Sequence, residues 1–96
     1  MKILAIEKEL ENTDWTFRKE ILEKEAHQVY QLYLSDHLRE IYFNDLNCAV
    51  LILECQNIAK AEELLSTLPL VAKKLIKFEI MHLKPYTGFE RIMETN

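Results

Sequence analysis

Residues 38–85, LREIYFNDLNCAVLILECQNIAKAEELLSTLPLVAKKLIKFEIMHLKP, decide the fold of this chain. Residues 39–43 alternate and carry Ile, Tyr and Phe, which predicts a strand. Residues 49–55 are nearly all apolar, which is typical of a central strand covered on both faces. Residues 58–67 predict a helix that begins after Gln56-Asn57 and stops at Pro69, because proline ends or kinks a helix. Residues 71–75 add one helical turn, and 78–84 form the last strand.

The first half of the chain adds a strand and a long helix. Ile3–Lys8 is rich in Ile and Leu and predicts a strand. Asn12-Thr13-Asp14 offers helix N-cap side chains, and a helix of period 3.6 is expected from Trp15 to about Ser35. Its inward positions are Ile21, Leu22, Ala26, Val29, Leu32 and Tyr33.

This order of elements predicts one α+β domain over residues 1–96. The pattern βαββαβ is the split βαβ arrangement of ferredoxin-like folds. Right-handed crossovers give a four-stranded antiparallel sheet in the order 4-1-3-2, with both helices on one face. The other face is apolar and has no helix to cover it. An exposed apolar face indicates an interaction surface, so we expect a second copy to cover it in a dimeric barrel.

Composition narrows the classes of function. The 96 residues carry a formal net charge of -4 with both signs interleaved, whereas a nucleic-acid-binding protein shows a clustered basic face. The sequence has no apolar run of about 18 residues, so no membrane span is expected. The first eight residues, MKILAIEK, meet a charge too early to be a signal peptide. Cys48 and Cys55, seven residues apart along one predicted strand, are too distant for a disulfide. Free thiols predict a cytoplasmic protein.

The second half of the chain resembles the muconolactone isomerase family. The residues that carry the resemblance are Arg39 and Tyr42, the segment from Glu63-Leu64-Leu65 to Leu68-Pro69-Leu70, and Glu79 and Leu83. The resemblance implies a ferredoxin-like dimeric α+β barrel that assembles into higher homo-oligomers and needs no cofactor. It also implies isomerisation, by a proton shift, of a small lactone or cyclic acid.

Candidate catalytic residues gather at one end of the predicted sheet. Glu7 and Tyr42 lie near the ends of their strands, and Glu79 lies near the start of its strand. Glu7 and Glu79 come within about 5–6 Å if they share a face, and two close carboxylates would hold one proton between them. Such a pair suits proton transfer, with Tyr42 donating to a developing oxyanion. The alternative is that both glutamates face solvent or pair with Lys8 and Lys77.

The opposite end of the sheet gathers Arg39 and Glu54 as candidate substrate-binding residues. Arg39 could bind a substrate carboxylate as a bidentate fork. The alternative is a structural ion pair between Arg39 and Glu54 across neighbouring strands.

Other kinds of site have weaker signals. The three histidines lack metal-ligand spacing, so no metal site is predicted, and a catalytic cysteine lacks an evident histidine partner. Trp15, Tyr30 and Tyr33 either line a small apolar pocket between helix and sheet or belong to the core. Two alternatives to an isomerase stay open. One is a non-enzymatic dimeric module that binds a small hydrophobic ligand or a partner chain, and the other is a cofactor-free monooxygenase.

Overall fold

The structure is a computed structural model that describes residues 1–10 and 18–93. Both the predicted N-cap at residues 12–14 and Trp15 lie outside the described residues. The elements in chain order are β1 (Lys2–Glu9), α1 (Arg18–Leu34), β2 (Leu38–Phe43), β3 (Ala49–Glu54), α2 (Ile58–Ser66), α3 (Pro69–Ala72), β4 (Ile76–Leu83) and α4 (Glu90–Met93). The predicted βαββαβ order is therefore confirmed; the short α3 corresponds to the predicted extra helical turn, and α4 is an addition.

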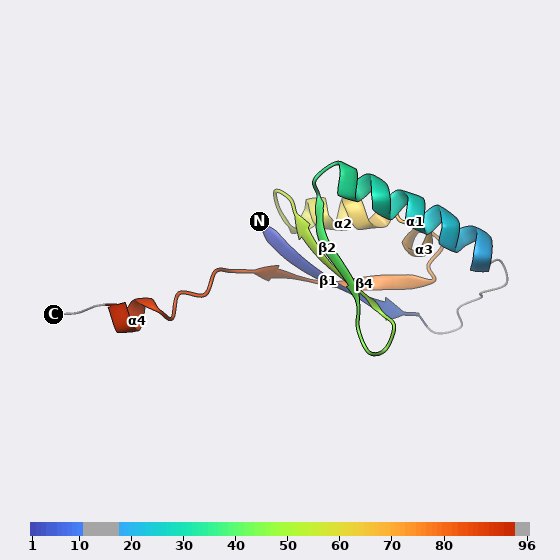
Figure 1. The fold of residues 1–96 in the computed structure, drawn as a ribbon. Coiled ribbons are helices and arrows are strands. Elements are labelled where there is room, and N and C mark those ends of the chain that lie inside the picture. The colour runs from blue at the N-terminus through green and yellow to red at the C-terminus, as the bar shows by residue number, and fades with distance from the viewer. Residues whose placement is uncertain (11–17, 94–96) are drawn as a thin grey trace.

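The four strands form one antiparallel sheet in the order β2-β3-β1-β4. Read from the β4 edge, this is the predicted order 4-1-3-2. Helices α1, α2 and α3 all lie on one face of the sheet (Figure 1). An α+β fold compatible with the ferredoxin-like prediction follows from this arrangement.

The register divides the strand residues between a helix-covered face and an open face. Ile3 and Ala5 of β1 stand opposite Leu53 and Leu51 of β3, and all four are buried under the helices. The residues between them point to the open face and are half-buried or exposed. The apolar side chains of the open face are Leu4, Ile6, Val50, Ile52, Met81 and Leu83. Both faces of β1 and β3 are thus apolar, as the sequence predicts.

The Leu-Pro-Leu segment separates two helices. Asn57 caps α2 by accepting a hydrogen bond from the Lys60 backbone N–H at 2.7 Å. The helix ends at Ser66, and Pro69 begins α3, where its missing N–H costs no helical bond. The predicted break is confirmed, although the extra turn covers residues 69–72 instead of 71–75.

Helix α1 contacts the rest of the protein at both ends and through Val29 and Glu25 between them. Ile21 packs with Leu70, Leu75 and Ile76, while Leu32 joins the main core. Three of the six predicted inward positions, Leu22, Ala26 and Tyr33, are exposed instead of packed in the core. The middle of α1 therefore leaves part of the space above the sheet unfilled.

The chain beyond β4 forms an arm that leads away from the body of the protein to α4 (Figure 1). The rings of Tyr86 and Phe89 pack edge to face with centroids 5.0 Å apart. The large apolar side chains of this arm are exposed; they are Tyr86, Phe89, Ile92 and Met93.

Candidate functional site

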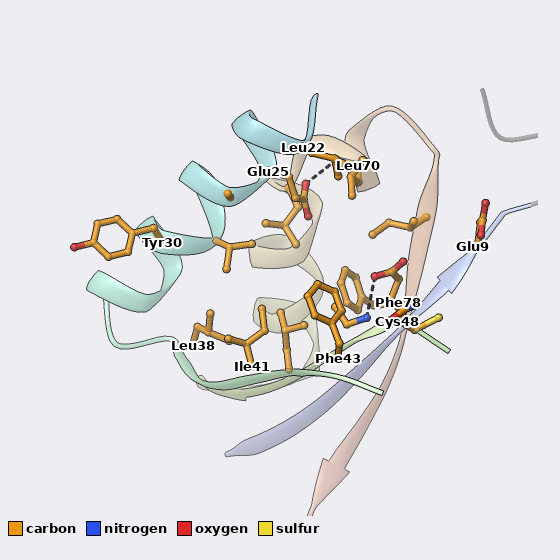
Figure 2. A pocket seen from close by; sticks show the side chains of 18 of the residues that line it. Glu9, Leu22, Glu25, Tyr30, Leu38, Ile41, Phe43, Cys48, Leu70 and Phe78 are labelled. Atoms are coloured by element: carbon orange, nitrogen blue, oxygen red, sulfur yellow. Dashed lines mark hydrogen bonds between the residues drawn. The ribbon is translucent and has the colours of Figure 1, made fainter. Parts of the chain in front are cut away.

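A pocket of about 1040 Å³ lies between α1 and the helix-covered face of the sheet. Figure 2 shows Leu22 and Tyr30 on its helix side, and Ile41, Phe43 and Phe78 on its strand side. This α1 pocket is lined by residues of α1, all four strands, the β2–β3 turn and the α2–α3 region. The apolar lining residues are Leu22, Ala26, Val29, Tyr30, Tyr33, Leu38, Ile41, Phe43, Leu46, Cys48, Ala49, Leu51, Leu68, Leu70, Ile76 and Phe78.

Exposed apolar side chains form the mouth of the α1 pocket. Phe43 at the end of β2 is 75% exposed, and Leu46 in the following turn is 81% exposed. Asn44 holds this turn, because its Oδ1 accepts hydrogen bonds from Leu46 N at 2.9 Å and Cys48 N at 3.0 Å. On the helix side, the rings of Tyr30 and Tyr33 stack with centroids 6.4 Å apart. The alternative that these two tyrosines line a pocket is confirmed.

Three carboxylates stand among the apolar lining residues, and backbone N–H groups hold two of them. Glu7 of β1 accepts a hydrogen bond through Oε1 from Ala49 N at 2.9 Å. Glu25 of α1 accepts one through Oε1 from Leu70 N at 2.9 Å, and Figure 2 shows this side chain directed at Leu70. These backbone donors fix each carboxylate at the pocket wall. Glu9, at the end of β1, also belongs to the lining.

The pKa of Glu25 is raised above its ordinary value. The main cause is burial, which disfavours the charged form, and the negative charge of Glu7 acts in the same direction. The hydrogen bond from Leu70 N lowers the pKa, by less than burial raises it and by more than Glu7 raises it. Glu25 therefore holds a proton more readily than a solvated glutamate does.

The structure does not bring Glu7 and Glu79 together. Glu79 stands opposite Ile6 in the β1–β4 register, which places it on the open face, whereas Glu7 lines the α1 pocket. Glu79 Oε2 lies 3.6 Å from Lys8 Nζ, on the same face. For Glu79 the geometry is therefore that of the alternative prediction, a surface ion pair.

Tyr42 also lies on the open face, opposite Val50. Its hydroxyl donates a hydrogen bond to Glu40 Oε1 at 2.7 Å, and this bond together with the charge of Glu40 raises the pKa of Tyr42. Because the sheet lies between Tyr42 and the α1 pocket, this hydroxyl cannot reach a ligand bound beside Glu7.

The expected ion pair between Arg39 and Glu54 is replaced by other contacts. Arg39 is the extra residue of a bulge in β2, and its Nε donates to the Asp36 carbonyl oxygen at 2.8 Å. Glu54 Oε1 lies 3.0 Å from the Met1 ammonium nitrogen. The hydrogen bond to this ammonium is the main cause that lowers the pKa of Glu54. Neither side chain lines the α1 pocket.

The remaining chemistry-bearing groups give no second site. Cys48 and Cys55 are free, as predicted, and burial raises the pKa of Cys55. Within residues 1–10 and 18–93, no three His, Cys, Asp or Glu side chains are placed to hold a metal ion. The helices in that same part of the chain are too short or too polar to span a bilayer.

Sequence reasoning missed Glu25, although a signal for it exists. Glu25 lies four residues after Ile21 and four before Val29, so it interrupts the apolar stripe of α1. Glu7 likewise follows Ile3 and Ala5 on the covered face of β1. A carboxylate in an apolar stripe is a departure from the usual pattern that indicates a buried acid.

Comparison with known proteins adds no relatives to this picture. No protein-family model matches the chain, and no curated protein matches it at a significant level.

Proposed function

We propose that this protein binds a compact, mainly apolar organic molecule in the α1 pocket. The observation that carries the proposal is a cavity of about 1040 Å³ with a predominantly apolar lining and few polar groups. Ligand sites in proteins are typically concave, apolar and about 300–1,000 Å³ in volume. The exposed apolar side chains at the mouth, Phe43 and Leu46, give such a molecule a route of entry.

A blocking substitution tests this proposal. Ala26 of α1 lines the pocket, so Ala26→Trp places an indole inside it. Ala59→Trp on α2 is the matched control, because Ala59 is exposed and lies outside the pocket. The probe is 2-naphthylmethanol, a neutral molecule whose binding is measured by NMR titration. Ala26→Trp should abolish binding of this probe, and Ala59→Trp should leave it unchanged. Equal binding by wild type and Ala26→Trp would refute the proposal.

A second candidate function is a cofactor-independent proton shift on the bound molecule. It is favoured by two carboxylates in one pocket, of which Glu25 has the raised pKa. The Glu7 carboxylate would take a proton from one carbon as the C=C bond moves, and the Glu25 carboxylic acid would return a proton to another carbon. Proton transfer from Glu7 to Glu25, directly or through water, would restore the starting state. A neutral unsaturated lactone, the substrate class implied by the resemblance to muconolactone isomerases, suits this chemistry.

Isotope exchange tests the second candidate. In D₂O, turnover of a β,γ-unsaturated γ-lactone should place deuterium at the newly protonated carbon, which NMR detects. Glu7→Gln and Glu25→Gln should each remove the activity, because both proton carriers are needed. Glu79→Gln is the control, since Glu79 lies on the open face. Loss of activity in Glu7→Gln and Glu79→Gln but not in Glu25→Gln would contradict this candidate and support the pairing of Glu7 with Glu79.

We also propose that the open face is covered by a second copy of the chain, giving a homodimer with the option of further assembly. Six apolar side chains on this face are half-buried or exposed, with Ile52 of β3 near the middle. The same face carries both signs of charge, for example Lys8 and Glu79 at one end and Lys2 and Glu54 at the other. A surface that combines an apolar centre with both charges can complement itself.

Sedimentation velocity tests the dimer. Wild type should sediment as a dimer or larger species, and Ile52→Glu should yield monomers, because an unpaired charge at the centre of an interface is costly. Gln56→Glu changes the charge equally at an exposed position outside the sheet and should leave the dimer intact. A monomeric wild type at micromolar concentration would contradict this proposal.

A further inference from the structure

Among the residues whose side chains the structure describes, the charged groups that line the α1 pocket are all acidic: Glu7, Glu9 and Glu25. Charges of one sign in a cleft with apolar walls produce a strong local potential, because the low dielectric of the walls focuses the field. The cavity supplies the space for a ligand, and the carboxylates set the charge that the ligand can carry.

Glu7 and Glu25 are placed to accept further hydrogen bonds. Their hydrogen bonds to Ala49 N and Leu70 N use Oε1 in both cases. No hydrogen bond or ion pair within the described residues uses Oε2 of either side chain. An ionised carboxylate has about four lone-pair sites. Each group therefore keeps an oxygen that a donor in the pocket can reach.

The negative charges of Glu7 and Glu25 also repel each other. The charge of Glu7 is one of the causes that raise the pKa of Glu25, after burial itself. A positively charged ligand would offset both the burial of the Glu25 carboxylate and its repulsion by Glu7. A ligand carboxylate would instead add a negative charge beside these two. Aromatic rings also line the pocket, among them Phe43 and Phe78, and the face of an aromatic ring can attract a cation.

We propose that the α1 pocket selects a hydrophobic amine, bound in its ammonium form between Glu7 and Glu25, over a carboxylic acid of the same shape. This inference rests on the proposed binding function and deepens it by assigning the ligand class. A primary alkylamine, like the lysine side chain, is protonated at pH 7. Its N–H groups would donate to the free carboxylate oxygens, and its apolar part would lie against the pocket walls. For the proton-shift candidate, the same charge favours a neutral lactone over a free acid.

Three isosteric probes test the inference: 2-naphthylmethylamine, 2-naphthylmethanol and 2-naphthoic acid. Calorimetric titration of the full-length protein at pH 7 should give the order amine, alcohol, acid, with the amine at least about tenfold tighter than the acid. Glu25→Gln and Glu7→Gln should each reduce the preference for the amine over the alcohol several-fold.

A matched variant separates a local effect from the charge of the whole protein. Glu23→Gln removes one negative charge from an exposed position on the same helix and should leave the amine preference unchanged. An equal loss in Glu23→Gln, or equal binding of amine and alcohol by wild type, would overturn the inference while leaving the pocket proposal standing. Failure of all three probes to bind would overturn both.

Discussion

Two leucines on β3 provide a sharp test of whether the α1 pocket is open in solution. Leu51 and Leu53 are 1% and 0% exposed and point to the same face of the sheet. Both belong to the same buried core cluster, but Leu51 also lines the pocket, whereas Leu53 lies outside the pocket lining. Truncation to alanine removes the same atoms in both cases, so any difference in cost reports on the space around each side chain.

The magnitude follows from the two parts of the cost. A buried Leu→Ala change costs about 2.7–5.0 kcal/mol, rising by about 24 cal/mol per Å³ of void that remains. Leu53→Ala leaves a sealed void and should cost about 4–5 kcal/mol. Leu51→Ala enlarges an existing pocket and should lie near the lower limit, so the two should differ by about 1–2 kcal/mol. For a domain of this size that difference corresponds to about 4–16 °C in Tm.

Urea denaturation followed by circular dichroism measures both costs. A total stability of about 5–14 kcal/mol is expected for 96 residues at about 0.05–0.15 kcal/mol each. If the wild type lies in the upper part of that range, both variants should still fold. Equal m-values would show that the denatured states are comparable. If Leu51→Ala proves as costly as Leu53→Ala, the space beside Leu51 is sealed in solution, and the argument for an open ligand site fails.

Three further predictions concern stability. Because folding raises the pKa of Glu25, the folded state binds more protons, and stability should fall as pH rises from about 4.5 through the folded-state pKa. In urea melts at several pH values, Glu25→Gln should remove this part of the pH dependence, and an unchanged pH profile would contradict the prediction. Asn57→Ala removes the cap of α2 and should cost about 1 kcal/mol, measured by the same melts; no loss would mean that the capping bond is absent in solution. A double-mutant cycle on Lys8 and Glu79, whose side chains are 50% and 59% exposed, should give a coupling below about 1 kcal/mol, and a larger value would point to a buried pair.

The arrangement of strands could be predicted from the sequence because its determinants are local. The apolar run of residues 49–54 requires cover on both faces, and Pro69 ends α2 wherever the rest of the chain lies. The crossover rule then leaves few ways to order four strands. The bulge at Arg39 could not be predicted in this way, because it depends on how β2 pairs with β3. That bulge shifts β2 by one residue and so decides which of its side chains face the helices.

The candidate site was harder to predict because it depends on register and on the height of a helix above the sheet. Glu7 and Glu79 do lie at the same end of the sheet, as their places in the strands indicate, but pairing of Glu79 with Ile6 puts it on the other face. The periodicity of α1 identifies its inward stripe, yet it cannot show that only Ile21 and Leu32 become buried. The pocket is the space that the exposed side chains of α1 leave unfilled above the sheet, and no local pattern encodes it.

The strongest reason to regard this pocket as functional is that two separate departures from the folding pattern meet in it. On β1, the covered face continues from Ile3 and Ala5 to a glutamate, and on α1 a glutamate stands between Ile21 and Val29 in the inward stripe. Each substitution of a charge for an apolar side chain lowers stability, because burial disfavours the charged form. Natural sequences depart from local consistency mainly at functional or strained sites. The elements that carry Glu7 and Glu25 are distant in the sequence, yet the fold brings both carboxylates to one apolar cavity. A single ligand that needs both acids accounts for the two departures together.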